Sequence, residues 1–401
     1  MKIALLKERK SPPDRRVVLS PQACKSLLEK YPQLEIVAES SDIRTFSDDE
    51  YREAGIPVSS DIASSDIMLG VKEVPVDRLI PEKSYIFFSH TIKKQPYNRK
   101  LLQAVLQKNI KLYDHELFVD GRGMRLIGFG FYAGIVGTYN GMRTYGLKYK
   151  LFELPKAETL ADKKALIKQL KAIDLPAIKI VLTGTGRVGR GAKEILDAIK
   201  IKEVDIPAFL NQKFEEAVYV NIDALDYNKR KDGEVRSLHD FFENGDEYEN
   251  DFMRFAREAD MLIAGHFWDE ESPRLITREQ AASPDFNIGV IADISCDING
   301  PIAATIRASS IAEPNYGYDP KTGKETDFRD PEAIAVMAVD NLPCELPRDA
   351  SIGFGEMFGK AIIPAFFNDD KDEILHRALM TRHGKLTKHY AYLQDYVDGK
   401  E

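Results

Sequence analysis

The stretch AIKIVLTGTGRVGRGAKEIL, residues 177–196, reads as a strand, a glycine-rich turn and a helix. The apolar run IKIVL (178–182) is typical of a buried parallel strand. Gly184, Gly186 and Gly189 then give the pattern G-x-G-x-x-G, and apolar residues recur at helical spacing beyond it. Because strand, turn and helix follow in this order, the stretch predicts a dinucleotide-binding fingerprint rather than an ordinary glycine turn.

Each glycine of this fingerprint has its own physical role. The first permits the tight turn, the second lets the main chain approach a pyrophosphate, and the third lets the helix pack against the strand. The N-terminus of the helix offers free N–H groups and the positive end of its dipole to the phosphates. The predicted cofactor-binding residues of this loop are Gly184, Thr185, Gly186, Arg187, Val188 and Gly189.

The length and composition of the chain set limits on its function. More than 170 of the 401 residues precede the fingerprint, which is enough for a separate domain, and the total suggests two domains or three. A hydrophobic content of 43% is ample for buried cores. The net charge of −8 argues against a nucleic acid or an anionic membrane as the main partner.

Cysteine usage and hydropathy indicate a cytoplasmic location. Cys24, Cys296 and Cys344 are widely spaced, so they predict reduced thiols rather than disulfides or a metal cluster. The first ten residues are too charged for a signal peptide, and no window approaches the ~20 apolar residues of a membrane span. We therefore expect no membrane association.

Strands and helices alternate over the first third of the chain. The expected strands are 2–8, 34–39, 66–73, 85–90 and 110–116. The expected helices are 20–31, with Ser20 as its N-cap, 48–55, stopped by Gly55, and 98–109. This alternation predicts an α/β domain with a mostly parallel sheet.

The remainder of the chain supplies a second α/β region around the fingerprint. We expect helices over 131–147 and 158–173, and further strands over 217–223, 259–265 and 287–295. Two polar stretches, 228–250 and 318–332, are expected to be surface loops and short helices. The segment from about Asp340 is helical in period and is expected to pack back on the first domain.

The predicted fold class is therefore α/β, with two Rossmann-like domains, mostly parallel sheets and an active-site cleft between them. The expected domains are a substrate-binding catalytic domain over 1–136 plus 341–401 and a cofactor domain over 137–340.

Charged side chains follow several of the expected N-terminal strands, where ligands of open α/β sheets bind. They are Arg16 beside Arg15, Lys72 with Glu73, His90 with Lys93 and Gln95, and Glu116 with Arg125 further on. Taken singly, each Lys or Arg fits a solvated loop charge, and His90 fits a hydrogen-bonded structural histidine equally well. No histidine has H-E-x-x-H spacing, so no metal site is expected.

At these motifs the sequence resembles the saccharopine dehydrogenase branch of the alanine dehydrogenase and transhydrogenase superfamily, and within it the lysine–ketoglutarate reductase type. The resemblance covers nearly the whole chain. The motifs that carry it are IMLGVK (67–72), YIFFSHTIKKQ (85–95), GFGFYAGIVG (128–137), VLTGTGRVGRG (181–191), ESPRLITRE (271–279), IADISCDINGPI (291–302) and VDNLPCELPRDAS (339–351).

The resemblance implies roles for residues at matching positions. The catalytic lysine and histidine of the family fall on Lys72 and His90, and its carboxylate-binding arginine falls on Arg16. The other implied substrate-site residues are Lys93, Gln95, Arg125, Glu73, Glu116 and Asp340.

The chemistry of saccharopine agrees with these residue types. Saccharopine joins lysine through its ε-nitrogen to a glutarate unit and carries three carboxylates, so bidentate arginines suit it. Its oxidation removes a proton from a secondary amine, which a lysine with a depressed pKa can accept. His90 would move protons during hydrolysis of the imine to lysine and 2-oxoglutarate.

The expected cofactor is NAD, with NADP left open. Asp223 ends the expected strand 217–223, lies 34 residues beyond Gly189, and would bind the adenine ribose and repel a 2′-phosphate. Asp226 is the fallback if the strand ends later. The basic run Lys229–Lys231 could instead serve NADP.

Other functions stay open at this point. Alanine dehydrogenase is the runner-up, because the same fold with Arg16, Lys72 and His90 would handle pyruvate. A transhydrogenase subunit and a non-catalytic NAD-binding protein are further alternatives. The expected partners are a small amino acid and a 2-oxo acid, with a homo-oligomer possible and the direction of the reaction undetermined.

Overall fold

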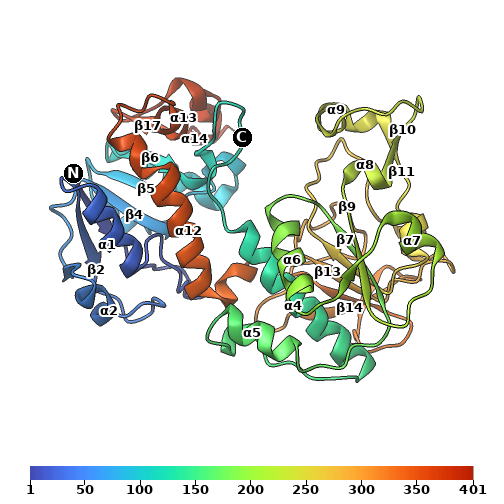
Figure 1. The fold of residues 1–401 in the computed structure, drawn as a ribbon. Helices are drawn as coiled ribbons and strands as arrows, with labels where there is room; N and C mark the ends of the chain where they lie inside the picture. The colour runs from blue at the N-terminus through green and yellow to red at the C-terminus, as the bar shows by residue number, and fades with distance from the viewer. Residues whose placement is uncertain (401) are drawn as a thin grey trace. The chain divides into compact units, whose positions relative to one another are not determined.

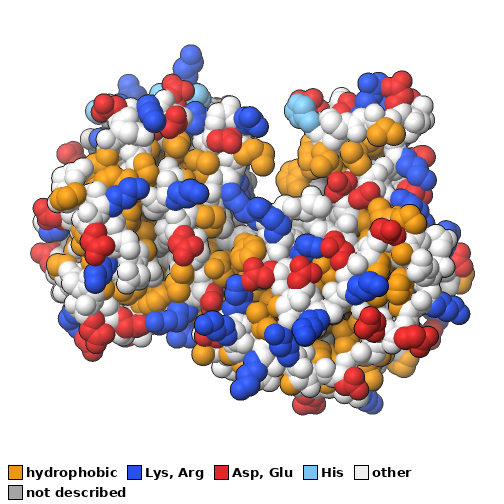
Figure 2. Space-filling view, in the orientation of Figure 1, with side chains coloured by type: hydrophobic (Ala, Val, Ile, Leu, Met, Phe, Trp, Pro, Cys, Tyr) orange, Lys and Arg blue, Asp and Glu red, His pale blue; other side chains and the backbone are white. Residues whose placement is uncertain are grey.

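The computed structural model describes residues 1–400, which form two compact units. The first unit contains Met1–Phe129 and the C-terminal segment from Pro347, and the second contains Gly130–Leu346. Within residues 1–400, no helix combines the length and apolar character that a membrane span requires. Figure 2 shows acidic and basic side chains interspersed over the visible face of each unit.

The first unit is built on a six-stranded parallel sheet in the order β3-β2-β1-β4-β5-β6. Its strands are β1 (Lys2–Leu5), β2 (Glu35–Glu39), β3 (Val58–Ser59), β4 (Ile67–Lys72), β5 (Ser84–Phe88) and β6 (Lys111–Asp114). Its helices are α1 (Pro21–Lys30), α2 (Asp48–Glu53), α3 (Arg99–Gln107), α12 (Pro347–Ala361), α13 (Ile374–Ala378) and α14 (Gln394–Val397). A small hairpin, β17 (Thr381–Arg382) and β18 (Lys385–Leu386), completes it.

Local chemistry explains where the first helices begin and end. The Ser20 side chain accepts the N–H of Ala23 and caps α1, and Gly55 adopts a φ of 81° just after α2, as the sequence predicts. Helices α1 and α12 lie side by side over one face of the sheet (Figure 1). The chain order of the strands reverses between β1 and β4, so the switch point where ligands of such sheets bind lies at these two strands.

The second unit has an eight-stranded sheet in the order β15-β14-β16-β13-β12-β7-β9-β8. Its strands, including the separate pair β10 and β11, are β7 (Lys179–Thr183), β8 (Lys202–Glu203), β9 (Val218–Ile222), β10 (Asn228–Arg230), β11 (Tyr248–Asn250), β12 (Met261–Ala264), β13 (Val290–Asp293), β14 (Asn315–Asp319), β15 (Lys324–Thr326) and β16 (Ile334–Met337). Its helices are α4 (Gly130–Tyr149), α5 (Lys163–Leu170), α6 (Arg187–Ala198), α7 (Ile206–Asn211), α8 (Ala224–Tyr227), α9 (Leu238–Glu243), α10 (Met253–Ala256) and α11 (Arg278–Ala281).

Close packing of α4 on α6 explains the glycines of both helices. A Cβ atom at Gly134 would lie 2.0 Å from the carbonyl oxygen of Val188, and one at Gly191 would lie 1.9 Å from that of Phe131. Side chains at these positions would therefore force the two helices apart. The pair covers one face of the sheet in Figure 1.

Both polar stretches that were expected to be loops and short helices also contain strands. Residues 228–250 form an antiparallel pair, β10 and β11, around α9, and the stretch projects from the rest of its unit in Figure 1. Residues 318–332 contain the end of β14 and all of β15, which pair antiparallel at the edge of the sheet. The prediction was wrong there because an edge strand needs few apolar side chains, and β15 is largely exposed.

Candidate functional site

The parallel register of the first sheet brings the ends of three strands to one edge. Lys72, the last residue of β4, lies opposite Phe88 of β5, and Phe87 lies opposite Asp114 of β6. His90 follows β5 by two residues and Glu116 follows β6 by two, so the sheet places them near Lys72. The electrostatic influence of both Lys72 and Glu116 on the pKa of His90 agrees with this placement.

His90 is a largely buried imidazole held between opposite charges. Its main chain is left-handed, with a φ of 54°, and its ring stacks on Phe88 at 6.2 Å. Burial and then the charge of Lys72 lower the pKa of His90 to about 4, against the opposing effect of Glu116 and Glu73. The imidazole is therefore neutral near pH 7, whereas the sequence suggested a group that titrates there.

Two carboxylates flank this imidazole. Glu73 places Oε2 at 3.8 Å from Nδ1 of His90 and accepts a 2.9 Å hydrogen bond from Lys10 through Oε1. Burial acts to raise the pKa of Glu73, but Lys10 and His90 hold it below its ordinary value. Oε1 of Glu116 lies 3.6 Å from the Arg125 guanidinium. Oε2 of each carboxylate is buried without a hydrogen-bond partner among the described residues.

Arg16 is buried rather than free in a loop. Its side chain is held by Asp14, which accepts from Nε at 3.0 Å and from Nη2 at 2.6 Å, and its Cζ lies 4.3 Å from the centre of the Phe129 ring. Burial acts to raise the pKa of Asp14, and the charges of Arg16 and Lys72 outweigh it and lower that pKa. Arg16 is thus oriented by a carboxylate that sequence reasoning did not single out.

The remaining predicted substrate residues are more peripheral. Lys93 lies in the short 3-10 turn Thr91–Lys93 with an exposed side chain and contributes to the lowered pKa of His90. Gln95 is exposed, and its carbonyl oxygen accepts a hydrogen bond from the Tyr396 hydroxyl. Asp340 is exposed and belongs to the second unit.

Sequence reasoning also missed Glu8 and His115. Both Glu8 oxygens accept main-chain N–H groups, from Val71 at 2.7 Å and Lys72 at 2.9 Å. Nε2 of His115 lies 2.9 Å from the carbonyl oxygen of Gly70. The only signal for Glu8 was its position soon after the first strand, inside a charged run that reads as exposed.

The glycine loop of the second unit has the geometry that a dinucleotide needs. Gly184 follows β7 with a φ of 94°, and Gly186 precedes the first residue of α6. A Cβ atom at Gly189 would lie 1.9 Å from the carbonyl oxygen of Gly184, so only glycine allows the helix to start this close to the strand. Thr185 is exposed, and Arg187 and Val188 form the half-buried first turn of α6.

Asp223 lies at the carboxyl end of β9, beside the strand that leads into this loop. One of its carboxylate oxygens accepts the N–H of Leu225 and caps α8, and Asp226 completes the capping box. In the basic run Lys229–Lys231 that follows, two side chains pair with acidic residues. Lys229 pairs with Asp251 at 2.7 Å. The Arg230 guanidinium pairs with Asp232, Asp240 and Glu247.

One further buried histidine lies near the loop. His266 follows β12 by two residues, and its Nδ1 lies 2.8 Å from the hydroxyl oxygen of Thr183, the last residue of β7. Burial lowers the pKa of His266 to about 4, so the ring is neutral. The contact therefore links the carboxyl ends of two paired strands, β7 and β12.

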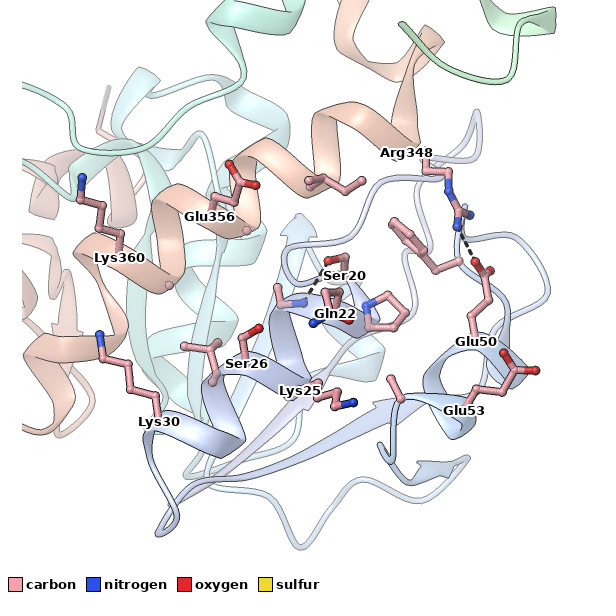
Figure 3. Close-up of a pocket in the computed structure, with 18 residues that line it drawn as sticks. Ser20, Gln22, Lys25, Ser26, Lys30, Glu50, Glu53, Arg348, Glu356 and Lys360 are labelled. Carbon is pink, nitrogen blue, oxygen red and sulfur yellow. Dashed lines mark hydrogen bonds and ion pairs between the residues drawn. The ribbon is translucent and has the colours of Figure 1, made fainter. Parts of the chain in front are cut away.

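The first unit also has an open groove on its surface. It has a volume of about 810 Å³, runs between α1, α2 and α12, and carries an ion pair between Arg348 and Glu50 (Figure 3). None of the predicted site residues lines it. Among residues 1–400, no group of His, Cys, Asp and Glu side chains has the arrangement of a metal centre.

Known proteins resemble this chain in sequence and in fold. Residues 4–136 match the family described as "Alanine dehydrogenase/PNT, N-terminal domain". A solved L-alanine dehydrogenase superposes with a TM-score of 0.66 at 17% identity over 99% of both chains, which shows a shared fold.

Two curated relatives are similar to this chain over most or all of its length. The mitochondrial alpha-aminoadipic semialdehyde synthase of Rattus norvegicus is 27% identical over 100% of this chain and 48% of its own length, so the chain spans about half of that relative. The saccharopine dehydrogenase [NAD(+), L-lysine-forming] of Emericella nidulans is 26% identical over 90% of both proteins. The chain is therefore similar over most or all of its length to proteins of the saccharopine dehydrogenase type, and its first third matches the alanine dehydrogenase/PNT N-terminal domain.

Proposed function

We propose that the chain is an NAD-dependent amino-acid dehydrogenase that interconverts saccharopine with L-lysine and 2-oxoglutarate. The observation that carries the proposal is the group at the carboxyl ends of β4, β5 and β6. There the charges of Lys72, Glu116 and Glu73 act on a neutral His90, and each of the two carboxylates has a buried oxygen that lacks a hydrogen-bond partner within residues 1–400. Such oxygens suit a substrate that carries cationic amines.

The dinucleotide would bind in the second unit. The loop from Gly184 to Gly189 leaves room for a pyrophosphate, and Asp223 would accept hydrogen bonds from the adenine ribose. NAD is favoured over NADP because a 2′-phosphate would meet this carboxylate, while Lys229 and Arg230 are already paired with acidic side chains. When bound, the nicotinamide supplies the hydride acceptor.

Lys72 and His90 would then share the proton transfers. Lys72 accepts the proton of the secondary amine as the adjacent carbon loses a hydride and a carbon–nitrogen double bond forms. His90 takes one proton from the water that adds to this carbon and gives it to the nitrogen. It then takes the hydroxyl proton of the resulting carbinolamine and gives it to the departing amine, so the carbon–nitrogen bond breaks and lysine and 2-oxoglutarate are left. Because the charge of Lys72 contributes to the lowered pKa of His90, the two groups act together on the proton transfers.

The arginines of the first unit would bind the carboxylates of the substrate. Arg125 has a half-exposed guanidinium beside Glu116, so it can turn towards a ligand. Arg16 is fixed by Asp14 and would offer a rigid cation. A fixed guanidinium orients a planar carboxylate better than a mobile ammonium does.

Nicotinamide fluorescence tests this function directly. We expect NADH oxidation that requires both lysine and 2-oxoglutarate, with NADPH a poorer donor. Oxidation with pyruvate and ammonia, but not with lysine and 2-oxoglutarate, would show an alanine dehydrogenase instead. Binding of NADH without turnover of either pair would show a non-catalytic protein.

A further inference from the structure

We propose that Glu8 is a positioning residue that fixes Lys72 by binding two successive main-chain N–H groups at the end of β4. The inference rests on the proposed function of Lys72 as the proton acceptor. Glu8 has no role in the chemistry described above, and both of its side-chain oxygens face the main chain rather than a ligand.

The first step of the argument is the way strand pairing ends at the switch point. β1 and β4 pair in register up to Leu5 and Leu69, and the N–H of Leu6 donates to the carbonyl oxygen of Leu69 at 2.9 Å. Beyond Leu69 the register between β4 and β5 also shifts. The last residues of β4 therefore lose a regular ladder just before Lys72, where a fixed main chain is most needed.

The Glu8 side chain replaces the missing ladder. Its Oε1 accepts from the N–H of Val71 at 2.7 Å and its Oε2 from the N–H of Lys72 at 2.9 Å. The side chain is only 7% exposed, so water does not compete for these donors. Two buried hydrogen bonds to one carboxyl group define the orientation of the main chain, and hence of the Cα–Cβ bond of Lys72.

Gly70, the residue before Val71, is held by a second side chain, that of His115. The carbonyl oxygen of Gly70 accepts a hydrogen bond from Nε2 of His115, which is 2.9 Å away. Burial lowers the pKa of His115 to about 3, so the ring is neutral and Nε2 must carry its proton. A Cβ atom at Gly70 would approach Oε1 of Glu8 to 3.4 Å and Cδ1 of Leu6 to 3.3 Å, so glycine lets the carboxyl group come close.

The surroundings of Glu8 connect it to the proposed site. Burial raises the pKa of Glu8 to about 8, opposed by the Val71 hydrogen bond, with Asp14 and Arg16 as the nearest charges that act on it. Lys72 acts in turn on Asp14. Glu8 is thus buried beside Lys72 and accepts a hydrogen bond from its main-chain N–H.

Glu8→Gln is the sharpest probe, because it preserves shape and replaces one acceptor by a donor. One of the two N–H groups then faces an amide N–H, so we expect kcat with lysine and 2-oxoglutarate to fall about tenfold or more, with the Kd of NADH unchanged. Glu8→Asp keeps both acceptors on a shorter side chain and should recover part of the lost kcat.

Glu39→Gln is the matched control. Glu39, the last residue of β2, is also 7% exposed; it accepts the main-chain N–H of Lys7 at 2.8 Å and pairs with Arg9. This variant should lower the midpoint of thermal unfolding by as much as Glu8→Gln does, yet keep the wild-type kcat.

A double-mutant cycle with Lys72→Met decides whether Glu8 acts through Lys72. If it does, Glu8→Gln causes no further loss of kcat once Lys72 is absent. The inference would be overturned if the kcat losses of the two substitutions multiplied in the double variant, or if Glu8→Gln kept the wild-type kcat. A low kcat of Lys72→Met would leave the proposed function intact in either case. A Lys72→Met enzyme with the wild-type kcat would instead overturn the proposed role of Lys72 as the proton acceptor, on which the inference rests.

Discussion

Nδ1 of His90 lies 3.8 Å from Oε2 of Glu73, while the neighbouring Lys72 acts on the same imidazole with the opposite charge. Burial and then the charge of Lys72 lower the pKa of His90, which keeps the imidazole neutral near pH 7. Because the charge of Lys72 contributes to the lowered pKa of His90, removing that charge should change the pKa of His90.

The first prediction concerns the pKa of His90. Lys72→Met removes the positive charge that lowers this pKa, so the pKa should rise. Glu73→Gln removes a negative charge and should lower it further. An NMR titration of the imidazole Cε1 proton, assigned with His90→Asn, measures both shifts. A pKa that stays the same in both variants would show that neither residue faces His90.

The second prediction concerns stability against pH. Burial lowers the pKa of His115 to about 3, so below about pH 6.5 the unfolded chain binds a proton that the folded chain does not. His115 should therefore reduce the free energy of unfolding as the pH falls, by about 2 kcal/mol between pH 6.5 and 5.

Urea unfolding of the wild type and His115→Asn at pH 7 and pH 5 measures this contribution. The stability difference between the two proteins should shrink at pH 5. His239→Asn is the control, because the His239 side chain is 80% exposed. A constant difference for His115→Asn would contradict the buried neutral imidazole.

The third prediction separates the roles of two glycines. Gly189→Ala places a methyl group 1.9 Å from the carbonyl oxygen of Gly184 and should destabilise the protein by about 1–3 kcal/mol. Gly186→Ala meets nothing within 4 Å, so it should fold normally but weaken NADH binding, since its methyl group would face the pyrophosphate. Calorimetry and NADH fluorescence titration distinguish these effects, and equal stability losses would contradict the separation.

The fourth prediction concerns cofactor choice. Asp223→Ser keeps an N-cap for α8 but removes the charge, so stability should be retained while NADH affinity falls about ten- to a hundredfold. Discrimination against NADPH should relax at the same time. Lys229→Ala serves as the control, because Lys229 already pairs with Asp251. If Lys229→Ala instead abolished a preference for NADPH, the basic run and not Asp223 would read the cofactor.

Sequence patterns predicted the elements whose signals are local. The Ser20 cap, the stop at Gly55 and the strand–glycine–helix unit around Gly184 each depend on residues within a few positions of one another. These features, with the alternation of strands and helices, were sufficient for the α/β fold class. The order of strands in each sheet depends on pairing between segments that are far apart in the sequence, which no local pattern displays.

The same distinction applies to the candidate site. Lys72 and His90 stand out because they follow apolar strands, but Glu8 lies 63 residues before the Val71 N–H that it binds. Its neighbours in the chain, Lys7 and Arg9, indicate an exposed segment. Burial of Glu8 arises only when β1 and β4 become adjacent, so no local pattern could reveal it.

The most direct test of the central claim is the kinetics of Lys72→Met with lysine, 2-oxoglutarate and NADH. Methionine keeps the bulk of the side chain but accepts no proton, so kcat and kcat/KM should fall together by about 10²–10⁴-fold. The Kd of NADH should stay unchanged, and small primary amines added to the assay should restore part of the rate. A wild-type kcat with a raised KM for lysine would contradict the account and leave Lys72 as a binding residue only.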